Sequence, residues 1–189
     1  MTLILLRHGQ SQWNLENRFT GFHDIDLSEQ GEEEARKAGR ELEKTQIDVV
    51  FSSTLRRARR TAELALSAAG QSMLLSQMSL SDALRERDYG ALTGLNKAET
   101  VTKHGEEQVR IWRRSYDVAP PEGESLKHVV ERVGIYYEHV LKPVINANKV
   151  TLVAAHGNSL RALLIILGLE TPETIATCEL ATGVPVFIY

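Results

Sequence analysis

The sequence predicts an α/β protein, with a three-layer α/β/α arrangement around a mostly parallel central sheet. Apolar runs without polar alternation occur at residues 3–6 and 150–155, and such runs are typical of strands buried on both faces. Segments with helical periodicity separate the strand-like segments along the chain. This alternation favours parallel pairing with helices on both faces of the sheet.

The two apolar runs end in the same way. The first leads into Arg7-His8-Gly9 and the second into His156-Gly157. Because open α/β sheets bind ligands at the carboxyl ends of their strands, both histidines are expected at one ligand-binding edge. A single histidine after a strand is more often a structural hydrogen-bonding group. Two such ends, one of them beside an arginine, instead predict a site for an anion.

The first half of the chain continues this alternation after a long polar loop. Ser28 is expected to cap the first long helix, because glutamates that complement the helix dipole follow it directly. The expected order is a helix over 29–44, a strand over 48–52, a helix from 53 to about 70 and a short strand within 74–80.

The second of these helices begins with hydroxyl side chains and arginines. Free backbone N–H groups at a helix N-terminus, together with guanidinium groups, can bind a phosphate. Helical spacing cannot bring all four arginines to one site, so at least two are expected to be surface charges. The four are Arg56, Arg57, Arg59 and Arg60.

A charged segment at 84–94 holds Glu86 between two arginines. A glutamate in this setting can form a simple surface ion pair. It can equally be a carboxyl group held at an arginine-lined site as a proton donor. The residues alone leave both interpretations open.

The second half is expected to hold two short helices, a long helix, a strand, an apolar helix and a final strand. The short helices lie over 96–114 with a break near Gly105, and prolines end this excursion at 120–121. Ser125 is expected to cap the long helix, which Pro143 should kink or end. After the strand at 150–155, Asn158 or Ser159 should cap a helix that stops at Gly168, and residues 185–189 form the last strand.

Composition narrows the class of protein. The 189 residues have 42% hydrophobic and 25% charged content, which is ordinary for a globular protein. A net charge of -3 argues against nucleic-acid binding as the main task. One cysteine, Cys178, fits a reducing compartment. No leader is evident, and the longest apolar stretch, 160–169, is too short to span a bilayer. We therefore expect a cytoplasmic protein without a membrane partner.

Two histidines, several arginines and one glutamate are suited to phosphoryl transfer. A neutral imidazole can attack phosphorus and form a phosphohistidine, while arginines neutralise the phosphoryl oxygens. A carboxylic acid of raised pKa can protonate the leaving oxygen. No metal is required, and the histidines and carboxylates lack the spacing of metal ligands.

The segment Leu6-Arg7-His8-Gly9 strongly resembles the signature of the histidine phosphatase superfamily. Other segments resemble its 2,3-bisphosphoglycerate-dependent phosphoglycerate mutase family, and the resemblance covers nearly the whole chain. The segments at 96–99 and 112–114 are specific to the mutases. The full set lies at 11–14, 17–21, 86–90, 95–100, 112–114, 155–162 and 181–185.

This resemblance implies a phosphoglycerate mutase-like fold and a role for each matching residue. His8 would be the phosphorylated nucleophile and Glu86 the general acid and base. Arg7, Arg57, Asn14 and His156 would surround the transferring phosphoryl group. The remaining substrate contacts would come from Thr20, Gly21, Tyr89, Lys97, Arg113, Arg114, Gly157 and Asn158.

The implied reaction interconverts 3-phosphoglycerate and 2-phosphoglycerate through bound 2,3-bisphosphoglycerate, which also primes the enzyme. A mutase must retain a highly charged intermediate while it reorients, which requires a second cationic subsite and exclusion of water. Lys97, Arg113 and Arg114 are the candidates for this subsite. We therefore expect one domain over 1–189, with a helical excursion at about 93–121 over the active site, and the resemblance leaves open a homodimer or homotetramer.

Three departures from the family pattern carry expectations. The connection at 122–124 is shorter than in longer mutases, so lid closure and subunit contacts are expected to differ. Longer relatives continue beyond the position of Tyr189 with another strand and a tail over the site. Either this is a natural short form or the sequence lacks its end, and a missing cover would raise phosphatase activity. Gln10 replaces a glutamate, which we expect to matter little.

Two alternative functions remain at this point. A phosphatase of the same superfamily would hydrolyse small phosphomonoesters, although it has less need of the second cationic subsite. A noncatalytic module could use the arginines to bind phosphorylated ligands. The presence of His8, Glu86 and His156 together argues against this module.

Overall fold

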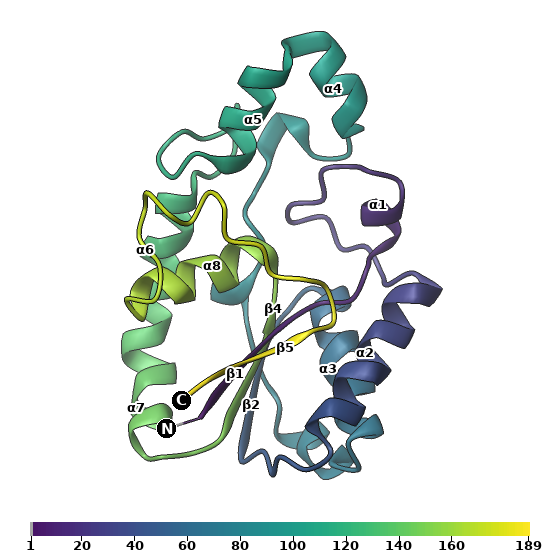
Figure 1. The fold of residues 1–189 in the computed structure, drawn as a ribbon, viewed down its shortest axis with the longest axis vertical. Coiled ribbons are helices and arrows are strands. Elements are labelled where there is room, and N and C mark those ends of the chain that lie inside the picture. The colour runs from purple at the N-terminus through teal and green to yellow at the C-terminus, as the bar shows by residue number, and fades with distance from the viewer. Residues whose placement is uncertain (1) are drawn as a thin grey trace.

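The computed structural model describes residues 2–189 and has the predicted three-layer architecture (Figure 1). Its single five-stranded sheet has the order β3-β2-β4-β1-β5. The three pairs among the first four strands are parallel, and only β5 runs antiparallel to its neighbour β1. The strands are β1 (Leu3–Arg7), β2 (Val49–Ser53), β3 (Ser79–Ser81), β4 (Thr151–Ala155) and β5 (Pro185–Ile188).

The register of the two central strands explains why the two histidines meet. Arg7 is the partner of Ala155, so His8 and His156 each follow directly after neighbouring parallel strands. The backbone N–H of His8 also donates to the carbonyl of Ala155 over 3.0 Å. The predicted common edge of the two His-Gly ends is therefore confirmed.

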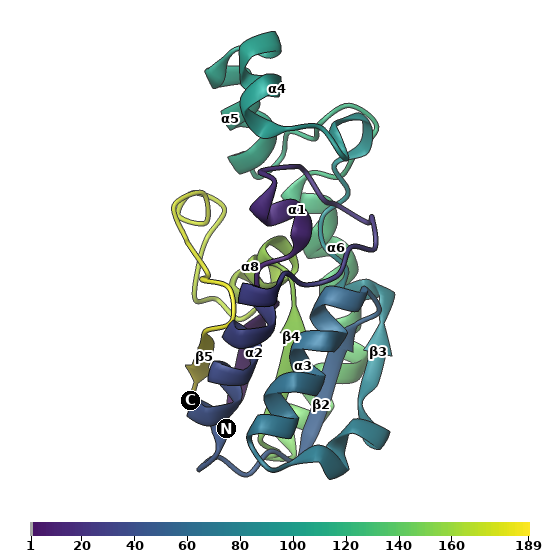
Figure 2. The same ribbon diagram turned by 90° about the vertical axis from the view of Figure 1, so that its right-hand side faces the viewer.

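Helices cover both faces of this sheet (Figure 2). The helices α2 (Glu29–Leu42) and α3 (Arg56–Ala68) lie together on one face. The other face is covered by α6 (Leu126–Tyr136), the π-helical turn η4 (Tyr137–Leu141), α7 (Lys142–Asn146) and α8 (Gly157–Ile166).

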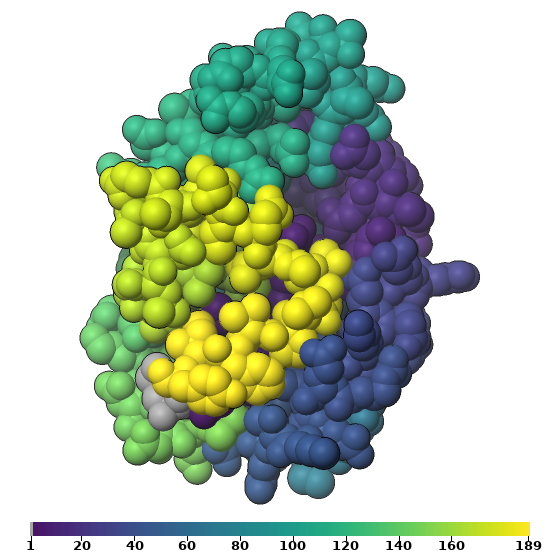
Figure 3. Space-filling view, in the orientation of Figure 1, coloured from purple at the N-terminus to yellow at the C-terminus, as the bar shows by residue number. Residues whose placement is uncertain are grey.

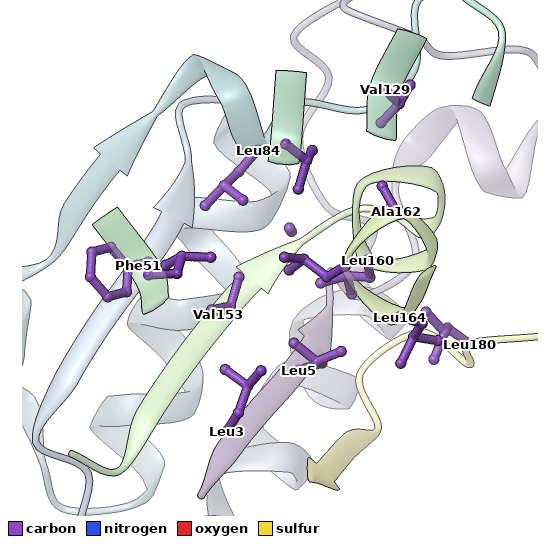
Figure 4. Packing of buried hydrophobic residues seen from close by; sticks show 14 of the residues in the cluster. Leu3, Leu5, Phe51, Leu84, Val129, Val153, Leu160, Ala162, Leu164 and Leu180 are labelled. Atoms are coloured by element: carbon purple, nitrogen blue, oxygen red, sulfur yellow. The ribbon is translucent and has the colours of Figure 1, made fainter. Parts of the chain in front are cut away.

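Strand β1 supplies apolar side chains to both sides of the sheet. Leu3 and Leu5 pack in the core beneath α6 and α8 (Figure 4), while Ile4 and Leu6 pack beneath α2 and α3. All four side chains are fully buried. Since successive strand residues face opposite sides, a central strand covered by two helical layers needs an uninterrupted apolar run.

Two short helices stand above the carboxyl ends of the strands (Figure 1). They are α4 (Lys97–His104) and α5 (Glu106–Arg114), and they break at Gly105, whose φ of +84° favours glycine. A small apolar cluster of Phe19, Leu92 and Val109 joins this pair to the loop after β1. The excursion at 96–114 therefore packs against the segment that follows β1.

The loop after β1 passes very close to the start of α2. A Cβ atom placed on Gly9 would lie 2.1 Å from the carbonyl oxygen of Gly31. Glycine at both positions is therefore required by the close approach of two backbones. This contact fixes the path of the chain immediately after His8.

The described residues differ from the predicted elements in three places. The expected strand within 74–80 is mostly the 3₁₀ helix η1 (Ser72–Gln77), and only 79–81 pair with the sheet edge. Pro143, expected to kink or end its helix, lies in the first turn of α7 and does not end the helical run, and the α-helical hydrogen bonding is interrupted just before it by the π turn η4, where the N–H of Lys142 donates to the carbonyl of Tyr137. The polar loop after Gly9 also contains an unpredicted helix, α1 (Gln12–Leu15), capped by Ser11.

The cap of α8 also differs from the prediction. His156 is the N-cap, rather than Asn158 or Ser159, because β4 leads into α8 without an intervening loop. The remaining short elements are the 3₁₀ helices η2 (Asp82–Leu84) and η3 (Gly90–Leu92). Across residues 2–189, none of the helices combines the length and the apolar character needed to cross a bilayer.

Candidate active site

The main candidate site is a cavity of about 150 Å³ between the strand ends and the helical excursion. In Figure 3 the yellow C-terminal segment borders a hollow whose rim also includes the teal excursion and purple N-terminal residues. Seven of the lining residues are arginine or lysine, whereas two are glutamate. The seven are Arg7, Arg18, Arg57, Lys97, Arg113, Arg114 and Arg161. Such a cavity is suited to a small ligand with more than one negative charge.

His8 lies in this cavity as a buried, neutral side chain. Its Nδ1 lies 2.7 Å from the carbonyl oxygen of Gly9, an acceptor, so Nδ1 carries the proton. This tautomer leaves Nε2 with a free lone pair. Burial, followed by the positive charges of Arg57 and Arg7, holds the pKa of His8 well below 6.5. The imidazole is therefore unprotonated and nucleophilic at neutral pH.

His156 lies behind His8, with its ring centroid 5.0 Å away. It is fully buried, and its Nε2 lies 2.9 Å from the hydroxyl oxygen of Ser53. Burial and the charge of Arg57 hold the pKa of His156 well below its ordinary value. Its Nδ1 is buried and has no hydrogen-bond partner within residues 2–189.

Backbone carbonyl groups hold the side chains of Arg7 and Arg57 in the cavity. Arg7 donates to the carbonyl of Leu180 over 2.6 Å, and Arg57 donates to the carbonyls of Gly21 and His23, each over 2.9 Å. These contacts fix both guanidinium groups without neutralising their charge. In each, the buried Nε has no partner within the described part of the chain, so a donor remains for a phosphate.

Arg57 is the one arginine at the start of α3 that reaches the cavity. Burial lowers its pKa to about 10, which leaves it charged at neutral pH. One of the N–H groups expected to be free for a phosphate at this helix start is already used, because the Arg56 N–H donates to the Asp24 carboxylate over 2.7 Å. The expectation that at least two of the four arginines are surface charges is confirmed by the surface ion pairs of Arg56, Arg59 and Arg60.

Glu86 is buried in the site, so it does not form the surface ion pair that was one of the two earlier interpretations. Its Oε1 accepts hydrogen bonds from the backbone N–H of Arg87, at 2.8 Å, and from Asn158, whose N and Nδ2 lie at 3.1 and 3.0 Å. The surface ion pair belongs instead to Arg85, which pairs with Asp82.

The expected raised pKa of Glu86 is wrong for the free protein. Burial alone would raise the pKa, but the Arg87 N–H, the positive charge of Arg57 and the hydrogen bonds from Asn158 outweigh it, so the pKa lies below 4.5. The free site therefore holds an ionised carboxylate, ready to accept a proton. Anionic ligands would shield the arginines and raise the pKa towards that of a proton donor.

Arg132 and Glu124 hold the segment that carries Glu86. Arg132, on α6, pairs in a bidentate manner with Glu124 over 2.9 and 3.0 Å. The same guanidinium donates to the carbonyls of Ala83, Arg85 and Glu86, at 2.7, 3.1 and 2.9 Å. Sequence reasoning missed this pair, because nothing near positions 124 and 132 indicates that they contact residues more than 35 positions away.

The second cationic group lies on the excursion. Lys97 at the start of α4 and Arg113 and Arg114 at the end of α5 all line the cavity. Burial and the nearby charge of Arg113 lower the pKa of Lys97. Crowding of cations in a partly buried space indicates that an anion belongs among them. Arg114 forms an ion pair with Glu179 over 2.6 Å.

The cavity brings together the predicted site residues, and His156 alone among them lies behind its wall. Five lining residues were not predicted as site residues: Arg18, Phe19, Arg161, Glu179 and Leu180. Arg161 lies within a motif already singled out, at a spacing of three from Asn158 on α8, and this spacing could have identified it. Glu179 and Leu180 carried no such signal.

Metal ligation has little support in the arrangement of side chains. Within residues 2–189, histidine, cysteine, aspartate and glutamate side chains do not form a group of three or more that could hold an ion. The chemistry open to these residues is nucleophilic attack by His8, proton transfer by Glu86 and charge stabilisation by arginines.

Comparison with known proteins agrees with this geometry. A sequence model of the histidine phosphatase superfamily (branch 1) matches residues 3–183. A 2,3-bisphosphoglycerate-dependent phosphoglycerate mutase of Mesorhizobium japonicum is 54% identical over 187 residues, or 98% of this chain and 90% of that protein. A mutase of the same name from Methylocella silvestris is 54% identical, over 97% and 89%.

Solved structures with similar folds include phosphatases. A mycobacterial glucosyl-3-phosphoglycerate phosphatase in complex with VO3 has a TM-score of 0.83 and 28% identity, covering 98% of this chain and 90% of that chain. A structure described as mycobacterial hydrolase 1 has the same TM-score and identity, covering 98% and 87%.

Proposed function

The chain belongs to the histidine phosphatase superfamily (branch 1), and on that premise we propose that it is a 2,3-bisphosphoglycerate-dependent phosphoglycerate mutase. The enzyme interconverts 3-phosphoglycerate and 2-phosphoglycerate, a step of glycolysis and gluconeogenesis. Two relatives of that name are 54% identical to this chain over 97–98% of its length.

One observation carries the proposal. A neutral His8 and a separate group of cations, formed by Lys97, Arg113 and Arg114, line the same small cavity. A phosphatase needs a nucleophile and one anion subsite. A mutase also has to retain the second anionic group while its intermediate turns around, and a second cationic subsite serves that purpose.

In the proposed reaction His8 carries the phosphoryl group. The phosphorylated Nε2 of His8 faces a hydroxyl group of phosphoglycerate, whose oxygen attacks phosphorus as the P–N bond breaks. The electron pair of that bond returns to Nε2, which restores the neutral imidazole. Arg7, Arg57, Asn14 and His156 hold the phosphoryl oxygens during transfer.

Glu86 moves the proton in this scheme. Its ionised carboxylate accepts the proton of the attacking hydroxyl. After reorientation, Nε2 of His8 attacks the other phosphate, the P–O bond breaks, and Glu86 returns the proton to the leaving oxygen. The substrate is held meanwhile by Thr20, Gly21, Tyr89, Lys97, Arg113, Arg114, Gly157 and Asn158.

The residues also fit 2,3-bisphosphoglycerate as the primer. The buried Nε atoms of Arg7 and Arg57 lack partners within residues 2–189, and so can donate to one phosphate. Lys97, Arg113 and Arg114 line the same cavity, and we propose that they bind the second phosphate and the carboxylate. When bound, 2,3-bisphosphoglycerate supplies the phosphoryl group that first loads His8. We propose that no metal takes part.

The proposal includes the setting of the enzyme. Its ligands are small-molecule phosphoglycerates, without nucleic acid or membrane, and its location is the cytoplasm. Residues 1–189 act as one phosphoglycerate mutase-like domain, with the excursion at about 93–121 as the cover of the site. Measurement of the mass in solution will distinguish a monomer from a homodimer or homotetramer.

A phosphatase is the second candidate, because the similar solved structures include a glucosyl-3-phosphoglycerate phosphatase. The deciding experiment measures conversion of 3-phosphoglycerate to 2-phosphoglycerate and release of inorganic phosphate by the same preparation. We expect isomerisation to exceed hydrolysis. Hydrolysis in excess would instead assign the protein as a phosphatase of small phosphomonoesters.

A His8→Ala variant tests the nucleophile directly. It should abolish isomerisation and the acid-labile label transferred from 2,3-bisphosphoglycerate, while thermal unfolding stays cooperative. The exposed His139 provides the control, because His139→Ala should retain both. Isomerisation retained by His8→Ala would refute the assignment, and absence of any acid-labile label on the unaltered protein would favour a binding module.

A further inference from the structure

Three consecutive residues of the C-terminal segment are held by three arginines of the cavity. Arg161 donates to the carbonyl of Cys178 through Nε and Nη2, at 2.9 and 2.7 Å. Arg7 donates to the carbonyl of Leu180 over 2.6 Å. Between these two anchors, the Glu179 carboxylate contacts Arg114 over 2.6 Å. The position of Glu179 is therefore fixed by its neighbours on both sides.

Glu179 is an acidic side chain in a cavity whose charged lining residues are mainly cations. It and Glu86 are the two carboxylates among the lining residues, and Glu86 has its own donors in Arg87 and Asn158. Burial would raise the pKa of Glu179, but the hydrogen bond and charge of Arg114 lower it below its ordinary value. The side chain thus places a full negative charge where the proposed function requires an anionic group of the substrate.

We propose that Glu179 is a specificity-determining residue that competes with the second anionic group of the ligand for Arg114. This inference rests on the proposed function, because it takes Arg114 as part of the second subsite. A ligand with two anionic groups must displace the carboxylate from Arg114. A ligand with one anionic group at His8 need not.

The exchange is close to balanced, because one carboxylate or phosphate replaces another at the same guanidinium. The side chain of Glu179 is 67% exposed and that of Arg114 is 29% exposed, so the pair is weak and can open. Occupation of Arg114 by Glu179 reduces the apparent affinity for the doubly anionic ligand by the fraction of molecules in which Arg114 is engaged. Glu179 therefore sets how strongly the site favours ligands with two anionic groups.

The test compares two non-hydrolysable probes of the same length. 3-Phosphonopropanoate carries a phosphonate and a carboxylate, and propylphosphonate carries the phosphonate alone. Calorimetry measures both dissociation constants for the unaltered enzyme and for Glu179→Gln, which removes the charge and keeps the size. Affinity for 3-phosphonopropanoate should rise about two- to fivefold, the range of an exposed ion pair, with propylphosphonate nearly unchanged.

Two further variants separate competition from other effects. Glu173→Gln alters an exposed glutamate of the same segment that does not line the cavity, and should change neither affinity. In an Arg114→Gln background, Glu179→Gln should lose its effect, because the group being competed for is gone. In steady-state kinetics, Glu179→Gln should lower KM for 3-phosphoglycerate more than it changes kcat.

Unchanged or weaker binding of 3-phosphonopropanoate by Glu179→Gln would overturn the inference. Equal gains for both probes would do so as well, because they would indicate a general change in the field of the cavity. Neither phosphonate is turned over, so these results do not depend on isomerisation. A protein that hydrolysed phosphoglycerate without isomerising it would fail the proposed function and still test Glu179.

Discussion

At the residue scale, burial among arginines sets the protonation of the groups proposed to be catalytic. His8 and His156 are uncharged because a protonated imidazole would lose its hydration beside Arg57 and Arg7. The same arginines, together with amide donors, keep Glu86 ionised. The same electrostatic environment thus suits His8 to its proposed role as nucleophile and Glu86 to its proposed role as proton acceptor.

The buried histidines also predict how stability depends on pH. Their pKa values lie below 6.5 in the folded state, so the unfolded chain binds more protons as the pH falls past that value. The free energy of unfolding should therefore decrease between about pH 7.5 and about pH 5.5. Urea denaturation at several pH values would measure it.

A variant assigns this pH dependence to the site. His8→Asn should show a shallower decrease than the unaltered protein, whereas His139→Asn, at an exposed position, should not. The depressed pKa of Glu86 adds its own loss of stability only below about pH 4.5. A free energy of unfolding that is constant down to about pH 5.5 would contradict the prediction.

Replacement of Glu86 tests its role in proton transfer. Glu86→Gln keeps the size of the side chain and removes its ability to take and return a proton. Isomerisation should fall by about 10²–10⁴-fold, the usual contribution of a positioned acid–base group. Glu173→Gln, at an exposed position, serves as the control. A loss much below about tenfold would mean that another group moves the proton.

At the scale of secondary-structure elements, α6 holds the segment that carries Glu86, although no residue of α6 lines the cavity. Arg132 of α6 donates to three carbonyls of the segment at 83–86, and Glu124 fixes the guanidinium. Glu124 also accepts from the N–H of Asp88 over 2.9 Å. The segment that carries Glu86 has little regular structure of its own, so its geometry depends on this ion pair.

Arg132→Lys should therefore reduce kcat while leaving KM for 3-phosphoglycerate nearly unchanged. Lysine keeps the charge but cannot reach the carboxylate and three carbonyls at once. A small displacement of Glu86 should lower kcat by about tenfold to a hundredfold. Steady-state kinetics would measure the split, with the exposed Arg40→Lys on α2 as the control. An unchanged kcat would show that the segment holds its position without Arg132.

At the scale of the whole molecule, the site exists only because distant segments meet. His8 and Arg7 come from β1, Asn158 from α8 and Glu86 from the segment after η2, while α4 and α5 bring Lys97 and Arg113 from above. In the proposed reaction, residues at the strand ends carry out phosphoryl transfer and residues of the excursion retain the second anionic group. Each part alone would leave half of the proposed reaction.

Arg113→Ala separates these two parts. Isomerisation of 3-phosphoglycerate should fall more than hydrolysis of p-nitrophenyl phosphate, which has one anionic group. We expect the two losses to differ by about tenfold or more, the value of one charge-assisted hydrogen bond. The control is Arg110→Ala, an exposed arginine on the same helix that pairs with Glu107. Equal losses in both reactions would remove the basis for a second subsite on the excursion.

The sequence alone determined the layers of the fold, the common edge of His8 and His156 and the break at Gly105. These features depend on local sequence patterns, such as unbroken apolar runs and a glycine between two helical segments, which can be recognised before the fold is known. The structure shows that Gly105 has a positive φ. Resemblance to a family then identified residues of the excursion, such as Arg113, that no local pattern would have assigned.

Only the tertiary structure decided which charges serve the site. It placed Arg57 in the cavity and its three neighbouring arginines in surface ion pairs, because one face of α3 is buried and the other is exposed. It made Glu86 an ionised, buried carboxylate, and it brought Glu179 to Arg114 and Arg132 to Glu124. The charge state and partner of a side chain depend on burial and on distances between residues far apart in the chain, and these distances exist only once the chain has folded.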